Sequence, residues 1–471
     1  MKPSSQDTEK SLRFFAVLLA ISNVAHLSIH LPMISFSTEW ISGALVLLAA
    51  GWVIAAPQVK SLLVLAVIQC VNVILLAPFN PDHWLLVFFI NLVLIVSAFC
   101  VWVREGTVSP QKLMQRTAPA ARLVFLICYG FAAFSKLNSD FLFSENSAAR
   151  ELFQIQLGAM PILNWLVWPP MVPWVTIVCE STIPLLLLFK RTRVLGILIG
   201  IGFHTALIIS PAVKVFDFTL TIVAMLYLFT PGNFESNIKT GIQDFKNRIP
   251  AIFGLFERYK WLLVGAPIGA VLAISCWHPM PDLPPRLVRL TASAGLFTVV
   301  LLGSIFLAGM IGNLMRHEGF RWTPRGAFGW LVIGLAIVNG LCPYLGLKTQ
   351  GSFTMFSNVR TEAGNWNHLV MPQSMQVFSD YQNKLVKIVG SDNESINQYY
   401  VASGNLITEF ELQRIVLTNP EIELTIEKDG NPIEINEPEN RLALGPPPGL
   451  LARKLLIFRA VSPDERILLT N

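Results

Sequence analysis

Apolar runs of membrane-spanning length recur along the first three quarters of this chain. Its 471 residues are 53% hydrophobic and only 14% charged, whereas soluble domains carry about 25% charged residues. In lipid the backbone must satisfy its own hydrogen bonds, and about 20 apolar residues suffice for one spanning helix. We therefore expect an all-α polytopic membrane helix bundle of about eleven spans, at 12–34, 40–56, 61–79, 83–103, 118–137, 171–189, 194–211, 215–230, 259–277, 291–314 and 326–345.

The distribution of lysine and arginine predicts how these spans are oriented. If the N-terminus lies inside, the inner segments hold 19 Lys and Arg residues and the outer segments hold 4, besides Lys136. Cytoplasmic loops are enriched in these residues. The first apolar run lacks a small-residue cleavage site, so we interpret it as a retained span. An odd number of spans then places the C-terminal region outside.

The composition changes near residue 346. Residues 346–471 hold 11 Lys and Arg against 15 Asp and Glu, a net charge of 11 − 15 = −4. Alternating residues at 422–427 and 432–435 flank a turn at 428–431, which indicates a β-hairpin. We expect a small extracytoplasmic α+β soluble domain, with further strands at 384–389, 399–401 and 455–461 and a helix at 407–417.

Three ionisable residues lie inside the apolar runs, namely Lys136, Glu180 and His204. A charge at the bilayer centre costs at least ~2.5–3.5 kcal/mol, so such residues usually face a protein interior or a wet cavity. Burial disfavours the charged form of a lysine and lets it act as a base. We predict these three as catalytic residues, with Glu180 protonated or paired with His204 or Lys136. Alternatively, Lys136 snorkels to the interface, Glu180 pairs with a basic group for packing, and His204 is a satisfied core histidine.

Other polar residues near the outer ends of the same spans are predicted to bind substrate. They are Asn138, Asp140, Lys214 and Asp217; a surface ion pair is the alternative for the last two. The outer loop 138–170 contains apolar residues at helical spacing between 148 and 159, which indicates an amphipathic helix. Tryptophans follow it, so this loop is either a lid over spans five to seven or a plain connection with an aromatic anchor.

Metal-binding patterns are weak in this sequence. His26 and His30 are four residues apart and share a helix face, but no third ligand is evident, so we expect hydrogen bonding within the bundle and no metal. The six cysteines form no CxxC motif, which argues against a zinc site and a disulfide framework. A polar stretch at 354–368 is interpreted either as a ligand-binding or membrane-docking segment or as a well-bonded loop.

The order of several motifs resembles the HTTM (horizontally transferred transmembrane) domain family and the related membrane domain of vitamin K-dependent gamma-carboxylases. The motifs run from Tyr129-Gly-Phe-Ala-Ala-Phe-Ser-Lys136 to Asp140, then through Glu180, Lys190-Arg-Thr-Arg193, Phe203-His204 and 216–231. The resemblance covers about 12–235. It implies that Lys136 is the base that deprotonates a hydroquinone, with a quinone or hydroquinone as cofactor. Ser135 stands where carboxylases tend to have a second lysine.

With this resemblance, the chain divides into four expected regions. These are an HTTM/carboxylase-like membrane domain at 1–235, a basic cytoplasmic linker at 236–258, three further spans at 259–345 and the outer domain at 346–471. The resemblance suggests a bacterial inner (plasma) membrane protein that contacts the bilayer and a lipid-soluble small molecule, with no nucleic-acid partner. The alternatives are a non-catalytic scaffold whose outer domain binds a protein partner and, with less support because no inverted repeat is evident, a transporter.

Overall fold

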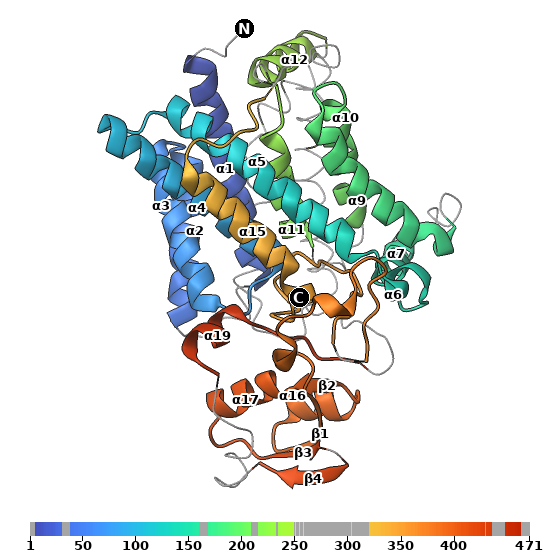
Figure 1. Cartoon of the computed structure of the whole chain (residues 1–471). Helices are drawn as coiled ribbons and strands as arrows, with labels where there is room; N and C mark the ends of the chain where they lie inside the picture. The colour runs from blue at the N-terminus through green and yellow to red at the C-terminus, as the bar shows by residue number, and fades with distance from the viewer. Residues whose placement is uncertain are drawn as a thin grey trace.

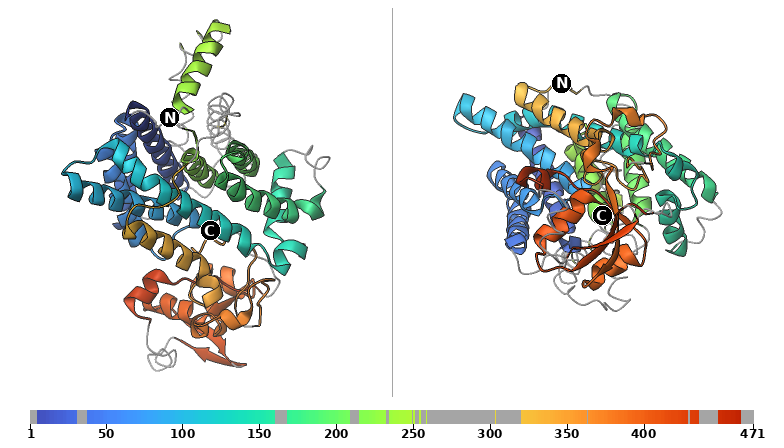
Figure 2. Two further views of the ribbon diagram at one scale, coloured as in Figure 1. Left: turned by 45° about the horizontal axis from the view of Figure 1, so that its top comes forward. Right: turned by 60° about the horizontal axis from the view of Figure 1, so that its bottom comes forward.

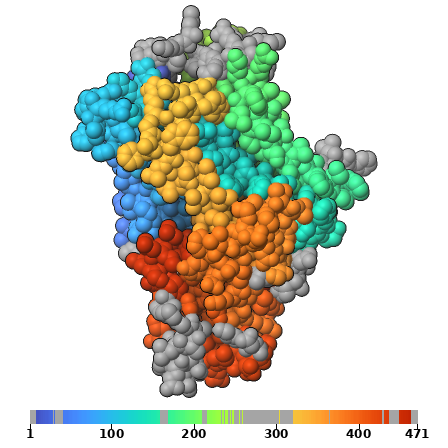
Figure 3. Space-filling model, in the orientation of Figure 1, coloured from blue at the N-terminus to red at the C-terminus, as the bar shows by residue number. Residues whose placement is uncertain are grey.

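The computed structural model is mostly helical and ends in a small antiparallel sheet (Figure 1). It describes residues 5–30, 38–159, 168–208, 215–231, 234–248, 320–362, 364–428, 430–435 and 448–462, together with positions 250, 254, 258 and 303. The helices form one bundle, and the sheet belongs to a lobe at one end of it (Figures 1 and 3). We call that end of the bundle the domain end.

Nine expected spans coincide with helices in the described part of the chain. They are α1 (Ser5–His30), α2 (Thr38–Ala55), α3 (Val59–Leu76), α4 (Asp82–Glu105), α5 (Pro110–Ser135), α9 (Val172–Leu188), α10 (Arg193–Leu207), α11 (Phe216–Tyr227) and α15 (Ala327–Leu345). Six helical segments, in α1, α3, α4, α5, η2–α9 and α15, are long and apolar enough to cross a membrane. The expected spans 259–277 and 291–314 lie outside the described residues, apart from position 303. The helical bundle is therefore confirmed, and the number of spans stays a prediction.

Helix α11 is the inner helix of the bundle. Its 12 residues extend only about 18 Å, which is shorter than the ~30 Å hydrocarbon core. Every residue from Thr219 to Tyr227 is buried. Outer helices instead expose large apolar side chains, such as Leu48 of α2 at 72% and Val178 of α9 at 61%. Apolar side chains around the outside of a bundle are the pattern expected of a protein surrounded by lipid.

The expected amphipathic helix in the loop after α5 is confirmed. Helix α6 (Ser139–Phe143) is followed by α7 (Ala148–Ala159) and by the short 3₁₀ helix η2 (Pro169–Met171). Helices α6 and α7 both pack against α9. Trp168 and Trp174 are exposed at 69% and 42%, as expected of aromatic anchors, while Trp165 lies outside the described residues.

The C-terminal lobe contains a four-stranded antiparallel sheet in the order β2-β1-β3-β4. The expected hairpin is confirmed, because Ile426 of β3 pairs with Ile433 of β4. Helix α17 (Glu409–Thr418) packs Leu412 into a core with Ile388 and Ile426. The strands are β1 (Leu385–Ser391), β2 (Leu406–Thr408), β3 (Leu424–Lys428) and β4 (Asn431–Glu434).

Two of the expected strands are wrong. Residues Asn397–Val401 form a π-helical turn η5, after the short helix α16 (Glu394–Ile396), because Asn393 caps that helix and Asn397 bonds back to the backbone of Ser391. In the last segment, α19 (Leu450–Leu455) is helical and the chain that follows makes a single bridge to β2. There Ile457 and Phe458 bond instead to residue 349 and to the Glu411 carboxylate.

The N-terminal end of α1 and the C-terminal lobe lie at opposite ends of the bundle (Figure 1). Helix α12 (Phe234–Arg248) begins just before the expected basic linker and lies at the same end as the start of α1 (Figure 1). Seen from below, the lobe lies across the domain end of the bundle (Figure 2). Residues 346–384 and the loop after α5 meet there, and the predicted site residues are found at this junction.

Candidate functional site

Lys136 is the residue at which α5 ends. The helix begins at Pro110, preceded by Ser109, whose hydroxyl accepts the backbone N–H of Lys112. At its other end, the backbone N–H of Lys136 closes the last turn on Ala133. The Lys136 side chain is only 2% exposed. Its Nζ donates to the carbonyl oxygens of Ala132 at 3.1 Å and Met355 at 2.7 Å.

Glu180 of α9 is the ionic partner of Lys136, with Oε2 2.8 Å from Nζ. The carboxylate side chain is 13% exposed, so the pair is largely removed from water. The contact does not have hydrogen-bond geometry, since Oε2 has no hydrogen-bond partner among the described groups. The two groups therefore form an ion pair. Of the pairings considered for Glu180, the structure shows the one with Lys136.

His204 of α10 pairs with Tyr129 rather than with Glu180. The Tyr129 hydroxyl and His204 Nε2 are in short hydrogen-bond contact. His204 is 2% exposed, and its Nδ1 is buried with no hydrogen-bond partner among the described residues. Tyr129 lies seven residues before Lys136, or about 10 Å along the axis of α5. The two pairs thus lie two helical turns apart on one helix.

Tyr129 was not among the predicted site residues. It stands in the motif that carries the family resemblance, but a tyrosine in an apolar helix is common because its ring packs and its hydroxyl needs one partner. Only the proximity of α10 to α5 shows that this partner is His204.

Asn138 and Asp140 connect two parts of the chain that are distant in sequence. Asn138 caps α6 through Phe141 N–H and donates to the Ser357 carbonyl at 2.6 Å. Asp140 forms an ion pair with Arg360 at 3.0 Å. Both residues therefore bind the loop after α5 to the segment that follows α15. Substrate binding by Asn138 and Asp140 stays a prediction, and Lys214 lies outside the described residues.

The chain from 353 to 358, which we call the 353–358 segment, has an unusual backbone. Phe353, Phe356 and Asn358 have φ of 61°, 47° and 54°, and positive φ is costly for bulky side chains. Neighbouring groups fix the conformation: Asp82 accepts Phe353 N–H at 2.7 Å, and the Asn358 side chain bonds to both 146 and 148. The polar stretch 354–368 is thus a well-bonded segment against the end of α5.

His368 completes this packing outside the spans. Its Nδ1 accepts the backbone N–H groups of Val370 and Met371. This leaves the Nε2–H to donate to the Phe134 carbonyl at 3.0 Å. Burial lowers the pKa of His368, while the bond to Phe134 opposes that shift. The residue is thereby held as one neutral tautomer that donates to a carbonyl at the end of α5, which also accepts the Leu137 N–H.

Asp217 lies in a second cluster, together with three histidines. Its Oδ2 is 2.8 Å from His83 Nε2, 3.0 Å from His26 Nδ1 and 3.5 Å from His30 Nε2. The sequence placed His26 and His30 on one face, as the structure does. It gave no reason to add His83 or Asp217, which are 57 and 191 residues from His26.

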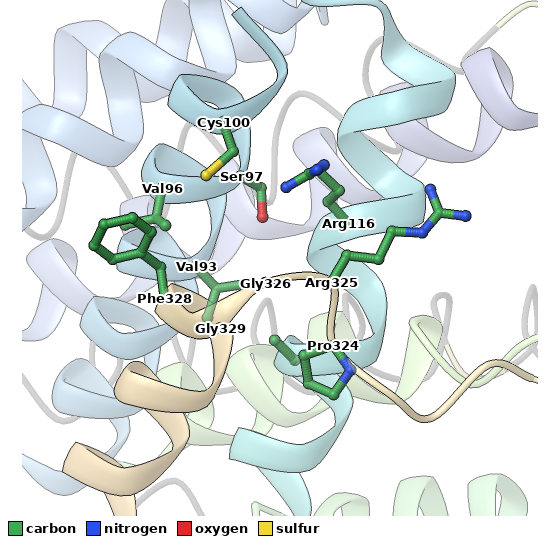
Figure 4. A pocket seen from close by; sticks show the side chains of 11 residues that line it. Val93, Val96, Ser97, Cys100, Arg116, Pro324, Arg325, Gly326, Phe328 and Gly329 are labelled. Atoms are coloured by element: carbon green, nitrogen blue, oxygen red, sulfur yellow. The ribbon is translucent and has the colours of Figure 1, made fainter. Parts of the chain in front are cut away.

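The cavities in the described part of the bundle include two small ones. One of about 50 Å³ is lined by His30, His83, Asp217, Met355 and Phe356, among others. The other, of about 20 Å³, lies between α4, α5 and residues 324–329, with Cys100 and Arg116 in its wall (Figure 4). The second cavity contains none of the predicted site residues. The first lies beside the histidine cluster and includes Met355, whose carbonyl binds Lys136.

Comparison with known proteins adds nothing to this geometry. No protein-family model, no curated protein and no solved structure matches the chain.

Proposed function

We propose that this protein is an HTTM-like membrane enzyme that acts on a lipid-soluble, quinone-type substrate, with Lys136 as the base. The observation that supports it is the buried Lys136–Glu180 pair, 2.8 Å apart, between two helices that are apolar over most of their length. Removing two charges from water has a large desolvation cost, and replacing such pairs by apolar residues is often neutral or stabilising. Because packing alone does not require the Lys136–Glu180 pair, its presence inside the bundle supports a functional role.

Glu180 gives Lys136 a way to become a base. In the ammonium form Nζ donates to the carbonyl oxygens of Ala132 and Met355 and forms an ion pair with Glu180. An apolar substrate that excludes water weakens the charged pair relative to the neutral one. Transfer of one proton from Nζ to Oε2 then leaves a carboxylic acid and an amine with a lone pair. The amine can take the proton of a hydroquinone hydroxyl, which yields the phenolate and restores the ammonium.

The Tyr129–His204 pair supplies hydrogen-bonding groups two helical turns from this base, about 10 Å along α5. His204 Nε2 is engaged by Tyr129, while Nδ1 has no hydrogen-bond partner in the described part of the chain. We assign His204 the role of binding a substrate oxygen and Tyr129 that of orienting the imidazole. A substrate reaches the pair from lipid past α9, where Val175 and Val178 are exposed.

The test is conversion of vitamin K hydroquinone by the full chain in lipid nanodiscs in air-saturated buffer, measured by chromatography. Dioxygen is the oxidant: one of its oxygen atoms enters the vitamin K epoxide and the other leaves as water. Lys136→Met and Glu180→Gln should each reduce the rate by at least about 100-fold, the range of a general base. Lys112→Met is the matched control, because Lys112 pairs with Glu105 on an exposed surface. Equal rates for wild type and Lys136→Met, or absence of both binding and conversion in the wild type, would refute the proposal.

A second function is favoured by the contacts of Asn138, Asp140 and Lys136 with 355–360. All three fasten the membrane bundle to the region leading into the C-terminal lobe, as a scaffold that presents this lobe to a protein partner would require. If the protein is a scaffold, deletion of the lobe abolishes its function in the cell, and Lys136→Met affects that function only by lowering the stability of the protein. The scaffold would be excluded if Lys136→Met, present at normal abundance, lost its function in the cell while the protein lacking 385–471 kept it.

We further propose a bacterial inner-membrane location, with the N-terminus cytoplasmic and the lobe extracytoplasmic. The charge bias and the placement of the two ends on opposite sides of the bundle support this orientation.

A further inference from the structure

Four potential metal ligands converge at the domain end of the bundle. His26 and His30 come from the last turns of α1, His83 from the first turn of α4 and Asp217 from the first turn of α11. One ligand atom from each lies within 4.8 Å of all the others. Three of the four residues are buried, and the His30 side chain is 22% exposed. Segments far apart in sequence thus direct three imidazoles and one carboxylate at a common point.

Hydrogen bonding alone does not account for this arrangement when Asp217 is a carboxylate. His26 Nδ1, His83 Nε2 and Asp217 Oδ2 form a triangle with sides of 3.0, 3.0 and 2.8 Å. An imidazole nitrogen either donates or accepts, and a carboxylate oxygen only accepts. If both nitrogens donate to the carboxylate, two N–H groups face each other at 3.0 Å. If one nitrogen accepts, its lone pair faces the carboxylate oxygen instead.

A cation at the centre removes this conflict, because all four lone pairs then point at it. Zinc binds imidazole nitrogen at about 2.0–2.1 Å and carboxylate oxygen at about 2.0–2.2 Å, in a tetrahedral arrangement. The ligand atoms of such a site are roughly 3.3 Å apart, as follows from tetrahedral geometry with those bond lengths. The observed contacts of Asp217 with the three histidines, 2.8, 3.0 and 3.5 Å, lie around this value.

The surroundings of the ligands also fit a metal centre. Asp217 Oδ1 accepts the backbone N–H of Phe218 at 2.7 Å, which orients the carboxylate and leaves Oδ2 directed at the histidines. The His26 ring stacks on Trp84 with centroids 3.9 Å apart. The adjoining cavity of about 50 Å³ has room for water, which needs at least ~10–15 Å³. A solvent ligand or an exchanging ion can therefore reach the His30 side of the cluster.

We propose that one divalent metal ion, zinc or iron(II), is bound by His26, His30, His83 and Asp217. Imidazole and carboxylate donors suit zinc and iron(II) rather than calcium or magnesium, which take oxygen ligands. The ion joins α1, α4 and α11 at the end of the bundle where the 353–358 segment packs. This site goes beyond the proposed function and does not depend on it, since Lys136 and Glu180 are not among its ligands.

The test is the metal content of the full chain. The protein is purified in detergent through an affinity tag that contains no histidine, in buffers that contain no chelator. Elemental mass spectrometry of the digested protein should find about one zinc or iron ion per chain. His30→Ala changes the most exposed ligand, and Asp217→Asn keeps the shape but removes the charge, so both should lose most of the metal. His368→Gln is the control, because His368 is another buried histidine that bonds only to backbone groups in the described structure.

A second measurement separates metal loss from misfolding. Protein stripped with chelator should bind cobalt(II) with the visible absorption of a four-coordinate N/O site, and its melting temperature should rise when zinc is restored. Asp217→Asn should show neither response while it remains monodisperse and helical. Absence of metal and of cobalt binding in the wild type, or equal metal in wild type and both ligand variants, would overturn the proposal.

Discussion

Lys136 illustrates how far a single residue can be interpreted from sequence. Its position at the end of an apolar run correctly indicated an ionisable group at a helix end, and Glu180 was among the partners expected. Its burial, at 2% exposed, could not be foreseen, because the 353–358 segment that covers it lies more than 200 residues away. The partners of Asn138 and Asp140 could not be foreseen for the same reason, because Ser357 and Arg360 are distant in sequence.

The buried pair predicts a non-additive response of stability. Lys136→Met leaves the Glu180 carboxylate without its cation and should destabilise the protein by about 3–5 kcal/mol. The double variant Lys136→Met/Glu180→Met removes both charges and should be less destabilised than Lys136→Met alone. The measurement is thermal unfolding in detergent of the wild type, both single variants and the double variant. Additive losses would show that the two charges do not stabilise each other.

Glu411 predicts a pH dependence of the C-terminal lobe. Burial raises its pKa from 4.5 to about 7, against the opposing effects of Arg414 and the Phe458 N–H. Because the folded-state pKa is the higher one, the folded state binds the proton more tightly. This stabilisation is fully present below pH 4.5 and is lost as the pH rises through about 7, by up to about 3 kcal/mol.

The corresponding variant is Glu411→Gln, which can still accept the Phe458 N–H. In the wild type, the unfolding temperature of the lobe should decrease as the pH is raised from 5 to 8. In the variant it should change less over the same range. An equal pH dependence in both proteins would assign the effect to other groups.

At the scale of elements, local pattern and tertiary packing contribute unequally. The β3–β4 hairpin and α7 were predicted because their periodicity and turn residues are local signals. Residues 399–401 were expected as a strand because aromatic and β-branched residues favour one. Side-chain bonds from Asn393 and Asn397 instead turn the chain there. Helix α11 is mostly apolar after its first turn, and only the structure shows that its surroundings are protein rather than lipid.

Helix α15 offers a matched test of its packing on α5. A Cβ at Gly340 would lie 2.2 Å from the Phe131 ring, whereas one at Gly334 meets nothing within 4 Å. Alanine is preferred to glycine in helices by about 0.8–1.0 kcal/mol, so Gly334→Ala should raise the melting temperature. Gly340→Ala should lower it, because overpacking costs about 1–3 kcal/mol. A stabilising Gly340→Ala would mean that α15 does not pack on α5 at this position.

At the scale of the whole molecule, the apolar runs and the alternating C-terminal residues were sufficient to predict a helical bundle with a C-terminal α+β lobe. They could not predict which helices meet, because apolar residues face lipid and protein alike. The histidine cluster shows the consequence. Two of its members were noticed at four-residue spacing, but His83 and Asp217 become neighbours only when α4 and α11 pack beside α1.

The arrangement of the ends predicts the membrane topology. A reporter enzyme that is active only outside the cytoplasm should be active when fused after residue 471 and inactive when fused within α12. Both positions lie on the expected sides according to the lysine and arginine bias. Activity of the α12 fusion, or inactivity of the C-terminal one, would reverse or refute the proposed orientation.

The most direct test of the proposed chemistry is the rate at which nanodisc-embedded protein converts vitamin K hydroquinone, compared between wild type, Lys136→Met and the Lys112→Met control. We expect conversion by the wild type and the control, and a rate at least about 100-fold lower for Lys136→Met. The same rate in all three proteins, or no conversion and no binding by any of them, would contradict the assignment of Lys136 as the base.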